Sequence, residues 1–387
     1  MKTSNGVKKK IAYVSGTRAD FGLMSPILKA IRKSDKLELR LYVTGIHLMP
    51  KFGQTAKEVE KEFSQVKRLP AIFKSDDRLG AARFCGEFLQ KLVIEFSANR
   101  PDFALTLGDR PEMLMTAAAC LYLGIPTGQI SAGDRSFTVD ELARHAITKL
   151  SHLHFPATKE AAKRVIKMGE EPWRVRTVGA PGLDVILNEK LPAKKEIFRF
   201  FKIDPRKKFL LFTQHPVSEE YKEAGKQVRE TIEALKQFKM PVVAVYSHAD
   251  AGGRRVISEI EKERNNPLFR IFPSLPYRHF LAAQREAAVL VGNSSAACVE
   301  SSSFKIPVIN IGARQLGRQH GGNVINVGYR RKEIAAAIKK CLEDKKYLKK
   351  LAKIKNPYGD GKTAQRVVRA LERLKLDKAL LKKQITY

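Results

Sequence analysis

The sequence predicts an α/β protein built from two doubly wound parallel sheets with a cleft between them. Short apolar segments that read as buried strands alternate with amphipathic helical segments along the whole chain. The alternation restarts after a stretch rich in Lys and Pro near the middle of the chain. The chain has 387 residues, and because 43% of them are hydrophobic it can form two cores of ordinary size.

The first half shows the strand–helix alternation most regularly. We expect strands at residues 11–14, 37–43, 103–107, 127–130, 154–157 and 175–178. We expect a first helix to begin near Met24, and further helices at residues 80–99, 112–123, 139–149 and 159–168.

The second half repeats the pattern after residues 188–205, which read as a linker around a short helix. We expect strands at residues 209–213, 241–246, 269–271, 288–291, 308–311 and 324–326, and helices at residues 219–238, 277–286, 296–304 and 332–343. A last amphipathic, basic helix over residues 361–381 is expected to pack back on the first half. We therefore divide the chain into residues 1–187, 188–360 and 361–387.

The composition argues against several classes of protein. Cys85, Cys120, Cys298 and Cys341 lie far apart with no CxxC pair, so neither a zinc site nor a disulfide framework is indicated. This cysteine usage fits a reducing cytosol. The apolar run near the N-terminus is too short for a signal peptide, and no window reaches the length of a membrane span. We expect a cytoplasmic protein that does not enter a membrane.

The formal net charge of +32 allows three interpretations. It can be a nucleic-acid footprint, a field that steers an anionic substrate, or a solvated surface suited to a hot or salty cell. The lysines are spread along the chain, and no RRM, KH or zinc-finger signature accompanies them. This distribution favours the solvated surface, and we do not expect nucleic acid as a partner.

Polar clusters follow several of the expected strands, and ligands bind at the carboxyl ends of strands in open α/β sheets. Gly16, Arg18 and Asp20 follow the first strand, where a glycine allows close backbone approach and an arginine supplies a fixed cation. Asp109 and Arg110 follow the strand at 103–107 and are expected to point into the cleft together, although a structural ion pair explains them equally well.

A second group of titratable side chains belongs to the segment after residue 130. Asp134 and Arg135 follow the strand at 127–130. Glu141, Arg144 and His145 have helical spacing and can share one face, as they also would on a solvated helix. Carboxylates in one cleft can divide the roles of proton acceptor and donor.

The second half offers groups that bind anions. His215 follows the strand at 209–213, although a lone loop histidine is often incidental. Asn293, Ser294 and Ser295 follow the strand at 288–291 and open a helix, where hydroxyls and backbone N–H groups can bind a diphosphate or simply cap the helix. Glu300 lies further along that helix. Two cations, Arg314 and Arg318, follow the strand at 308–311.

Taken together, these residues resemble the UDP-N-acetylglucosamine 2-epimerases, and in particular the hydrolysing branch of sialic-acid-type pathways. The matching blocks run in order over nearly the whole chain: GTRADFG from Gly16, LGDRPEM from Leu107, DELARHAITKLSHLHFPAT from Asp140, QHPVSEE from Gln214, DAGGRR from Asp250, VGNSSAACVE from Val291, INIGARQLGR from Ile309 and NPYGDGKTAQR from Asn356. The RHAITK segment and the arginine-rich block from Ile309 point to the hydrolysing branch.

The resemblance implies a GT-B fold, in which two Rossmann-like domains hold the active site between them. It implies UDP-GlcNAc or a close relative as the substrate. In the family reaction the C2 proton is removed and UDP is expelled to give a glycal. Water then adds to C1, and a proton returns to C2 on the other face, which yields N-acetylmannosamine and UDP. Neither a nicotinamide cofactor nor an obligatory metal is implied.

The resemblance also assigns residues. The positions implied to hold UDP are His215, Ser294, Ser295, Glu300 and Arg314. Arg18 and Arg110, with Arg314, are expected to neutralise charge on the departing UDP.

The implied sugar site lies in the first half. The candidates for proton transfer there are Asp109, Asp134, Glu141 and His145. Further residues of the matching blocks, Asp20, Arg144 and Asn293, are expected to bind substrate.

The sequence departs from the family pattern at one place. The family usually has Gly-Gly-Glu where this chain has Ala132, Gly133 and Asp134, and aspartate is one methylene shorter than glutamate. Arg135 and Phe137 are also unexpected there. Because these changes cluster near the sugar, a 2,4-diacetamido-trideoxy sugar substrate, as in legionaminic-type pathways, stays open.

Two other functions stay open from the sequence. A GT-B glycosyltransferase would share the UDP site but would need an acceptor, and its first domain would need fewer acids. A catalytically weakened relative would bind a nucleotide sugar, or nucleic acid, without turnover. For the assembly we expect a homodimer, with a tetramer as the alternative.

Overall fold

The computed structural model describes residues 7–248 and 250–387. The strands of the first half are β1 (Lys9–Ser15), β2 (Leu37–Val43), β3 (Val66–Arg68), β4 (Phe103–Leu107), β5 (Thr127–Ile130) and β6 (Leu153–Phe155). The strands of the second half are β7 (Leu210–Thr213), β8 (Val242–Val245), β9 (Phe269–Phe272), β10 (Val289–Gly292), β11 (Val308–Ile311) and β12 (Val324–Val327).

The helices of the first half are α1 (Arg18–Lys33), α2 (Ala56–Glu62), α3 (Arg78–Ala98), α4 (Pro111–Tyr122), α5 (Val139–Leu150), α6 (Lys159–Lys167) and α7 (Pro181–Asn188). Those that follow are α8 (Lys194–Phe201), α9 (Ala224–Lys236), α10 (Gly253–Glu261), α11 (Tyr277–Glu286), α12 (Ala296–Val299), α13 (Ser301–Phe304), α14 (Arg331–Glu343), α15 (Lys345–Leu351), α16 (Thr363–Arg373) and α17 (Lys378–Leu381).

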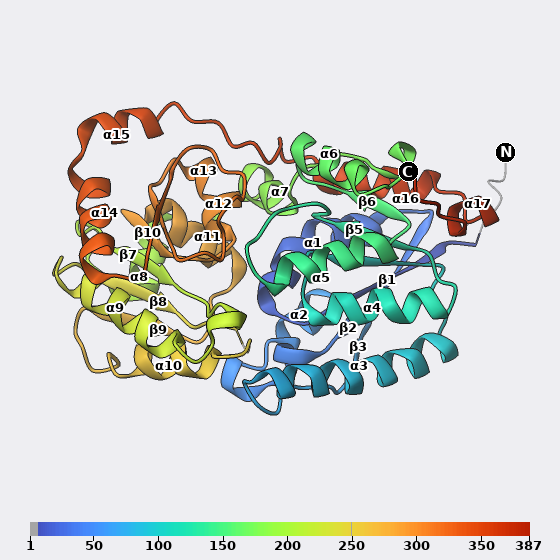
Figure 1. Ribbon diagram of the computed structural model, residues 1–387, viewed down its shortest axis with the longest axis horizontal. Helices are drawn as coiled ribbons and strands as arrows, with labels where there is room; N and C mark the ends of the chain where they lie inside the picture. The colour runs from blue at the N-terminus through green and yellow to red at the C-terminus, as the bar shows by residue number, and fades with distance from the viewer. Residues whose placement is uncertain (1–6, 249) are drawn as a thin grey trace.

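Each half is built on a six-stranded parallel sheet, and the two sheets form separate lobes (Figure 1). The strand order is β3-β2-β1-β4-β5-β6 in the first sheet and β12-β11-β10-β7-β8-β9 in the second. The order therefore reverses between β1 and β4 and again between β7 and β10. Ligands of open α/β sheets bind at such reversal points, outside the carboxyl ends of the strands.

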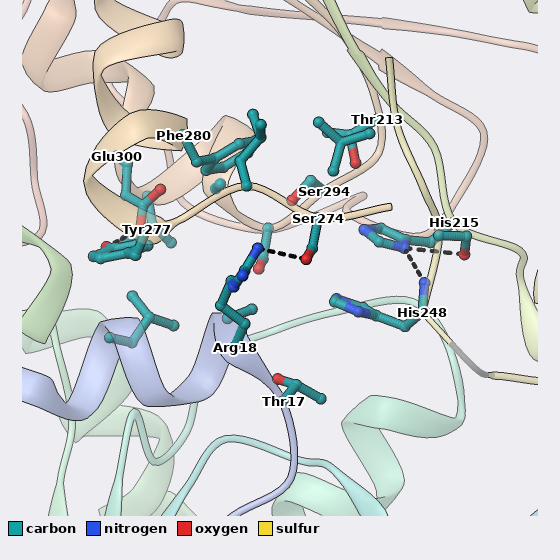
Figure 2. Close-up of a pocket in the computed structure, with 18 of the residues that line it drawn as sticks. Thr17, Arg18, Thr213, His215, His248, Ser274, Tyr277, Phe280, Ser294 and Glu300 are labelled. Carbon is teal, nitrogen blue, oxygen red and sulfur yellow. Dashed lines mark hydrogen bonds between the residues drawn. The ribbon is translucent and has the colours of Figure 1, made fainter. Parts of the chain in front are cut away.

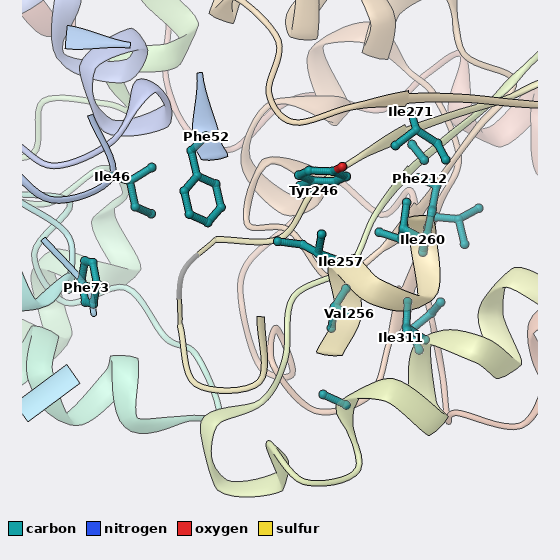
Figure 3. Packing of buried hydrophobic residues seen from close by; sticks show 14 of the residues in the cluster. Ile46, Phe52, Phe73, Phe212, Tyr246, Val256, Ile257, Ile260, Ile271 and Ile311 are labelled. Atoms are coloured by element: carbon teal, nitrogen blue, oxygen red, sulfur yellow. The ribbon is translucent and has the colours of Figure 1, made fainter. Parts of the chain in front are cut away.

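The apolar residues form cores on both faces of each sheet. One core joins the two lobes, because Ile46 and Phe52 of the first half and Tyr246 and Ile257 of the second belong to the same buried cluster (Figure 3). Burying apolar side chains from both lobes in one cluster opposes their separation.

The chain ends on the first lobe. After α15 the chain runs back over α7, and α16 packs against α1 and α7 (Figure 1). Arg174 donates hydrogen bonds to the carbonyl oxygens of Ala379 and Leu380 at 3.1 and 2.8 Å, and Lys383 donates to that of Ser151 at 2.8 Å. Within the described residues, no helix combines the length and the apolarity needed to cross a membrane.

Four expected elements differ from the structure. The first helix begins at Arg18 rather than near Met24, because Thr17 and Asp20 form a capping box and Pro26 lies inside the helix. Residues 175–178 form no strand, and Val175 makes only an isolated bridge to β6. The helix expected at 296–304 is two short helices, and the one expected at 361–381 ends at Arg373 and resumes at Lys378.

The stretch 188–205 is also more than a linker. Its helix α8 buries Ile197, Phe198 and Phe201 in the core of the second lobe. Because Lys and Pro are frequent around these three side chains in the sequence, their spacing was not recognised as the buried face of a core helix.

Gly292 is expected to be indispensable for the fold around the cleft. Its φ is +138°, and a Cβ there would lie 1.8 Å from the carbonyl oxygen of Thr213 on the neighbouring strand β7. Gly292→Ala is therefore expected to lower the free energy of unfolding by about 3 kcal/mol or more. Urea denaturation followed by circular dichroism measures it.

Gly86 provides the matched control. It is exposed inside α3, where an added Cβ meets no atom within 4 Å. Gly86→Ala is expected to raise the stability by about 0.5–1 kcal/mol through helix propensity. Equal effects of the two substitutions would contradict the close approach of β7 and β10.

Candidate functional site

A cavity of about 220 Å³ lies between the two lobes, at the carboxyl ends of the strands where both sheets reverse their order. Eight of the residues singled out from the sequence line it: Arg18, Asp134, His215, Ser294, Ser295, Glu300, Arg314 and Arg318. The others lie behind these or beside the cavity.

The end of β7 and the end of β10 are tied together by one amide side chain. Asn293 accepts a hydrogen bond from the His215 N–H at 2.7 Å and donates one to the His215 carbonyl at 2.9 Å. Asn293 is fully buried and does not line the cavity, so the structure makes it a clamp for the His215 loop rather than a ligand contact.

His215 faces the cavity as part of a stacked histidine pair. Its ring lies 4.5 Å from that of His248 at an interplanar angle of 10°, and Ser247 is 3.2 Å from its Nδ1 (Figure 2). Burial lowers the pKa of His215 well below its usual value and that of His248 to about 4. Both rings are therefore neutral at pH 7 and can offer a hydrogen bond without a buried charge.

Glu300 closes the opposite end of the cavity. It lies between α12 and α13, is buried, and accepts hydrogen bonds from Tyr277 at 2.6 Å and Gln284 at 3.0 Å (Figure 2). Burial raises the pKa of this carboxyl group, and the two hydrogen bonds counteract the rise. Ser294 and Ser295 line the wall between Glu300 and His215.

Arg18 enters the cavity from the first turn of α1. Its guanidinium donates to the Ser274 hydroxyl at 2.5 Å, across the cleft, and pairs with Glu58 (Figure 2). This places one cation between the Glu300–Tyr277 end and the two histidines.

Asp20 does not reach the cavity, contrary to the expectation that it contacts substrate. It is buried and accepts hydrogen bonds from the backbone N–H groups of Gly16 and Thr17 at 3.0 and 2.7 Å. The hydroxyls of Ser15 and Tyr13 also donate to it. With its oxygens engaged in this way, Asp20 shapes the loop that presents Arg18.

Asp109 and Arg110 point to different partners rather than into the cavity together. Asp109 forms an ion pair with Arg144, which is nearly fully buried. Arg110 contacts buried Glu112 at 3.1 Å and reaches toward Asp250 of the second lobe, 3.7 Å away. These pairs lie beside the cavity without lining it.

Asp134 is the one candidate for proton transfer that lines the cavity. It is 5% exposed, and its carboxylate accepts a hydrogen bond from Arg318 of the second lobe at 2.9 Å. Burial raises the pKa of Asp134, while Arg318 acts against the rise. Its carboxyl group faces the cavity and is thus positioned to exchange a proton with a bound ligand.

Glu141 and His145 lie one turn apart on α5, which follows the Asp134 loop. Glu141 accepts a hydrogen bond from the Ser136 N–H at 2.7 Å and lies 3.6 Å from the His145 Nε2. Burial lowers the pKa of His145, and Glu141 opposes this. Arg144 instead turns inward and donates to the Asp134 carbonyl at 3.0 Å. Glu141, Arg144 and His145 therefore do not face the cavity together, although their spacing along the helix allowed it.

Arg314 joins the two lobes at the edge of the cavity. It donates to Asp140 at 3.0 Å and to the Asn293 carbonyl at 3.2 Å, and its own carbonyl accepts from the Phe137 N–H at 3.2 Å. Its guanidinium thus fastens the start of α5 to the strand ends of the second lobe.

Several lining residues were not singled out from the sequence. They are Ser247, His248, Ser274, Tyr277, Phe280 and Tyr358. Tyr277 and Phe280 have helical spacing on α11, which reads as an ordinary core face. Ser247 and His248 directly follow the expected strand at 241–246, so the rule that found the other clusters could have found them.

The arrangement has two chemically different ends. Hydroxyls, neutral imidazoles and arginines suit a phosphorylated ligand, while the carboxyl end at Asp134 suits proton transfer. Among residues 7–248 and 250–387, no three His, Cys, Asp or Glu side chains are arranged to hold a metal ion.

Stability is expected to fall below pH 6.5 because His47 must stay neutral beneath the loop that presents Arg18. His47 is fully buried between Ser15 and Thr55, and burial lowers its pKa to about 3. The unfolded chain binds a proton below about pH 6.5 that the folded chain cannot bind until about pH 3. This costs about 2 kcal/mol of stability by pH 5.

His47→Gln is expected to make the loss of stability between pH 7.5 and pH 5 smaller by about that amount. Urea denaturation at both pH values measures the difference, and His320→Gln, at a partly exposed histidine, serves as the comparison. An unchanged pH dependence in His47→Gln would contradict a neutral, buried His47.

Comparison with known proteins shows what the chain resembles. A family model described as UDP-N-acetylglucosamine 2-epimerase matches residues 29–372. The UDP-N,N'-diacetylbacillosamine 2-epimerase (hydrolyzing) of Legionella pneumophila is 36% identical over 380 residues, which cover 98% of this chain and 100% of that protein. The UDP-N-acetylglucosamine 2-epimerase of Neisseria meningitidis is 33% identical over 336 residues, covering 86% of this chain and 87% of that protein.

Solved structures show the same fold. A crystal structure of UDP-GlcNAc 2-epimerase from Neisseria meningitidis bound to UDP-GlcNAc superposes with a TM-score of 0.79 at 20% identity, covering 94% of this chain and 100% of that one. The enzyme of Methanocaldococcus jannaschii in complex with UDP-GlcNAc and UDP gives 0.78 at 22% identity, covering 94% and 99%. The fold is GT-B, with two α/β domains and a cleft between them, and the chain belongs to the UDP-N-acetylglucosamine 2-epimerase family.

Proposed function

We propose that this protein is a hydrolysing 2-epimerase of UDP-2-acetamido sugars. The observation that carries the proposal is the cavity between the lobes, where Asp134 faces a set of hydroxyls, neutral histidines and arginines. The relatives from Legionella pneumophila and Campylobacter jejuni whose names include "hydrolyzing" support this branch of the family.

The second lobe supplies the groups for UDP in this proposal. Ser294, Ser295 and His215 donate hydrogen bonds to the diphosphate, and Arg314 neutralises its charge. Glu300 accepts hydrogen bonds from the ribose hydroxyls in this proposal. Its carboxylate lines the cavity, and its two hydrogen bonds within the protein come from the uncharged side chains of Tyr277 and Gln284.

The first lobe supplies the groups for the sugar. Asp134 takes the C2 proton while the C1–O bond to UDP breaks, which leaves a 1,2-glycal and UDP. Water then adds its oxygen to C1 and a proton is delivered to C2 on the other face, which gives the free manno-configured sugar. Asp109, Glu141 and His145 form the polar surroundings from which that second proton comes, and Arg18, Arg110 and Arg314 stabilise the charge of the leaving UDP.

The sugar is either N-acetylglucosamine or its 2,4-diacetamido-trideoxy relative. The Legionella and Campylobacter relatives are named for diacetylbacillosamine, and that of Neisseria meningitidis for N-acetylglucosamine. Asp134, Arg135 and Phe137 depart from the family pattern on the sugar side. Arg135 lies against Gly317 of the second lobe, so this departure affects how the lobes meet beside the sugar.

We also propose that the enzyme acts in the cytoplasm as a homodimer, in a pathway of the sialic-acid type. The cysteine usage supports a reducing compartment, because all four thiols are free. The dimer rests on the prevalence of two-fold symmetry among soluble oligomers.

Proton NMR in deuterated water tests the reaction. With UDP-GlcNAc or UDP-2,4-diacetamido-2,4,6-trideoxyglucose, we expect free UDP and a manno-configured sugar that carries deuterium at C2. Deuterium enters because the returning proton comes from groups that exchange with solvent. UDP release that depends on an added acceptor would indicate a glycosyltransferase, and UDP binding without turnover of either sugar would indicate a catalytically weakened relative.

Asp134→Asn is expected to lower turnover by about 10²–10⁴-fold, because the amide cannot take a proton. UDP affinity, measured by calorimetry, is expected to stay within about twofold, since UDP lies on the second lobe. Asp204→Asn removes a carboxylate from an exposed pair with Arg206 and serves as the control. Normal turnover in Asp134→Asn would show that another group takes the proton.

A further inference from the structure

The carboxylate of Asp134 is held by a side chain from the opposite lobe. Arg318, in the loop between β11 and β12, donates to the Asp134 Oδ2 at 2.9 Å. The two side chains are 9% and 5% exposed, and both line the cavity. They are separated by 184 positions in the sequence, so only the folded arrangement of the two lobes brings them together.

The first lobe holds the backbone around Asp134 but not its carboxylate. Arg144 donates to the Asp134 carbonyl at 3.0 Å, and Arg164 donates to the Gly133 carbonyl. Gly133 has a φ of +72°, and a Cβ there would lie 2.5 Å from the Ala161 carbonyl oxygen. The residue before Asp134 is therefore fixed against α6, while the carboxylate itself depends on Arg318.

Arg318 is in turn oriented by hydrogen bonds that lead to Asn293, the residue that holds the His215 loop on the proposed UDP side. It donates to Gln315 at 3.0 Å, and Gln315 donates to the Asn293 carbonyl at 3.3 Å. Asn293 holds the His215 loop. One chain of hydrogen bonds thus runs from the His215 loop, beside the proposed diphosphate site, to the Asp134 carboxylate at the proposed sugar site.

The titratable and charged groups around Asp134 come from four further elements. Arg164 and Glu160 face it from α6, and Arg144 approaches its carbonyl from α5. Tyr358 lies on the returning chain, and the Cys298 thiol lies on α12. Burial raises the pKa of Asp134, and among its neighbours Arg318 opposes the rise most strongly. Removing Arg318 therefore leaves a buried carboxyl group whose ionised form has lost its main partner.

We propose that Arg318 is a positioning residue, which reaches across the cleft to hold the Asp134 carboxylate ionised and aimed at the sugar. The contact between the two lobes thereby completes the proton-transfer group. The inference rests on the proposed function. It also explains how a side chain one methylene shorter than glutamate is held firmly, since the guanidinium is rigid and planar.

Two other roles of Arg318 make different predictions. If Arg318 bound the diphosphate directly, its loss would weaken UDP binding. If it only held the lobes together, its loss would change kcat and the pH profile in the same way as the loss of another ion pair between the lobes. Arg254 and Asp76 form such a pair, between α10 and the segment before α3, away from the cavity lining.

Arg318→Gln and Arg318→Lys, with Arg254→Gln as the control, test the proposal in the full chain. We expect Arg318→Gln to lower kcat by about 100-fold and to move the acid limb of its pH profile upward by about one unit. KM and the affinity for UDP are expected to change by less than about threefold. Arg318→Lys keeps the cation and is expected to restore part of kcat. Arg254→Gln is expected to leave the pH profile unchanged.

A combined variant shows whether Arg318 acts through Asp134. In the Asp134→Asn background, Arg318→Gln is expected to cause no further loss of kcat, because the group that it positions is already gone. Losses that multiply, together with weakened UDP binding and an unshifted acid limb, would overturn the proposal and assign Arg318 to the diphosphate.

Carboxyl ¹³C NMR of the substrate-free protein keeps this test separate from the reaction. The Asp134 signal, assigned by its absence in Asp134→Asn, is expected to titrate about one unit higher in Arg318→Gln than in the wild type. An unshifted titration would overturn the inference even if the enzyme is active. A wild type that turns over neither UDP-2-acetamido sugar would instead contradict the proposed function, while the titration would still report on the pair.

Discussion

The arginine–carboxylate pairs that cross the cleft are the interactions on which the candidate site depends. Arg318 meets Asp134 and Arg314 meets Asp140, each linking a loop of the second lobe to the segment around the start of α5. Breaking one partner of a buried pair costs about 3–5 kcal/mol, because the remaining charge is left without compensation. Charged contacts between the lobes therefore lie where the chemistry is proposed to occur, in addition to the apolar cluster that both lobes share.

The strand ends give this arrangement its rigid base. Gly292 lets β10 approach β7 closely, and Asn293 then binds both backbone groups of His215. In the first lobe Asp20 likewise accepts hydrogen bonds from backbone N–H groups of the loop before Arg18. In both lobes a buried polar side chain uses up its hydrogen-bonding capacity on the backbone, so that its neighbour can face the ligand.

Sequence reasoning succeeded where the signal was local. Alternating apolar and amphipathic segments predicted the parallel sheets, and small and polar residues after strands predicted where the cavity lies. It failed where burial was decided by distant residues. Residues 188–205 read as a linker around a short helix, yet Phe198 and Phe201 of that helix fill the core of the second lobe. The first helix was expected to begin near Met24, yet the capping box at Thr17 sets its start at Arg18.

The sequence by itself determined the fold class, the family and the set of polar residues at the strand ends, because these depend on spacing along the chain. Only the tertiary structure decided which of those residues face the cavity. Asp20 and Asn293 turn inward to bind backbone groups, whereas Asp134 faces the cavity and meets Arg318 from 184 positions away. Hydrogen-bond partners across a cleft depend on how two lobes meet, and that geometry is not encoded in the spacing of either segment.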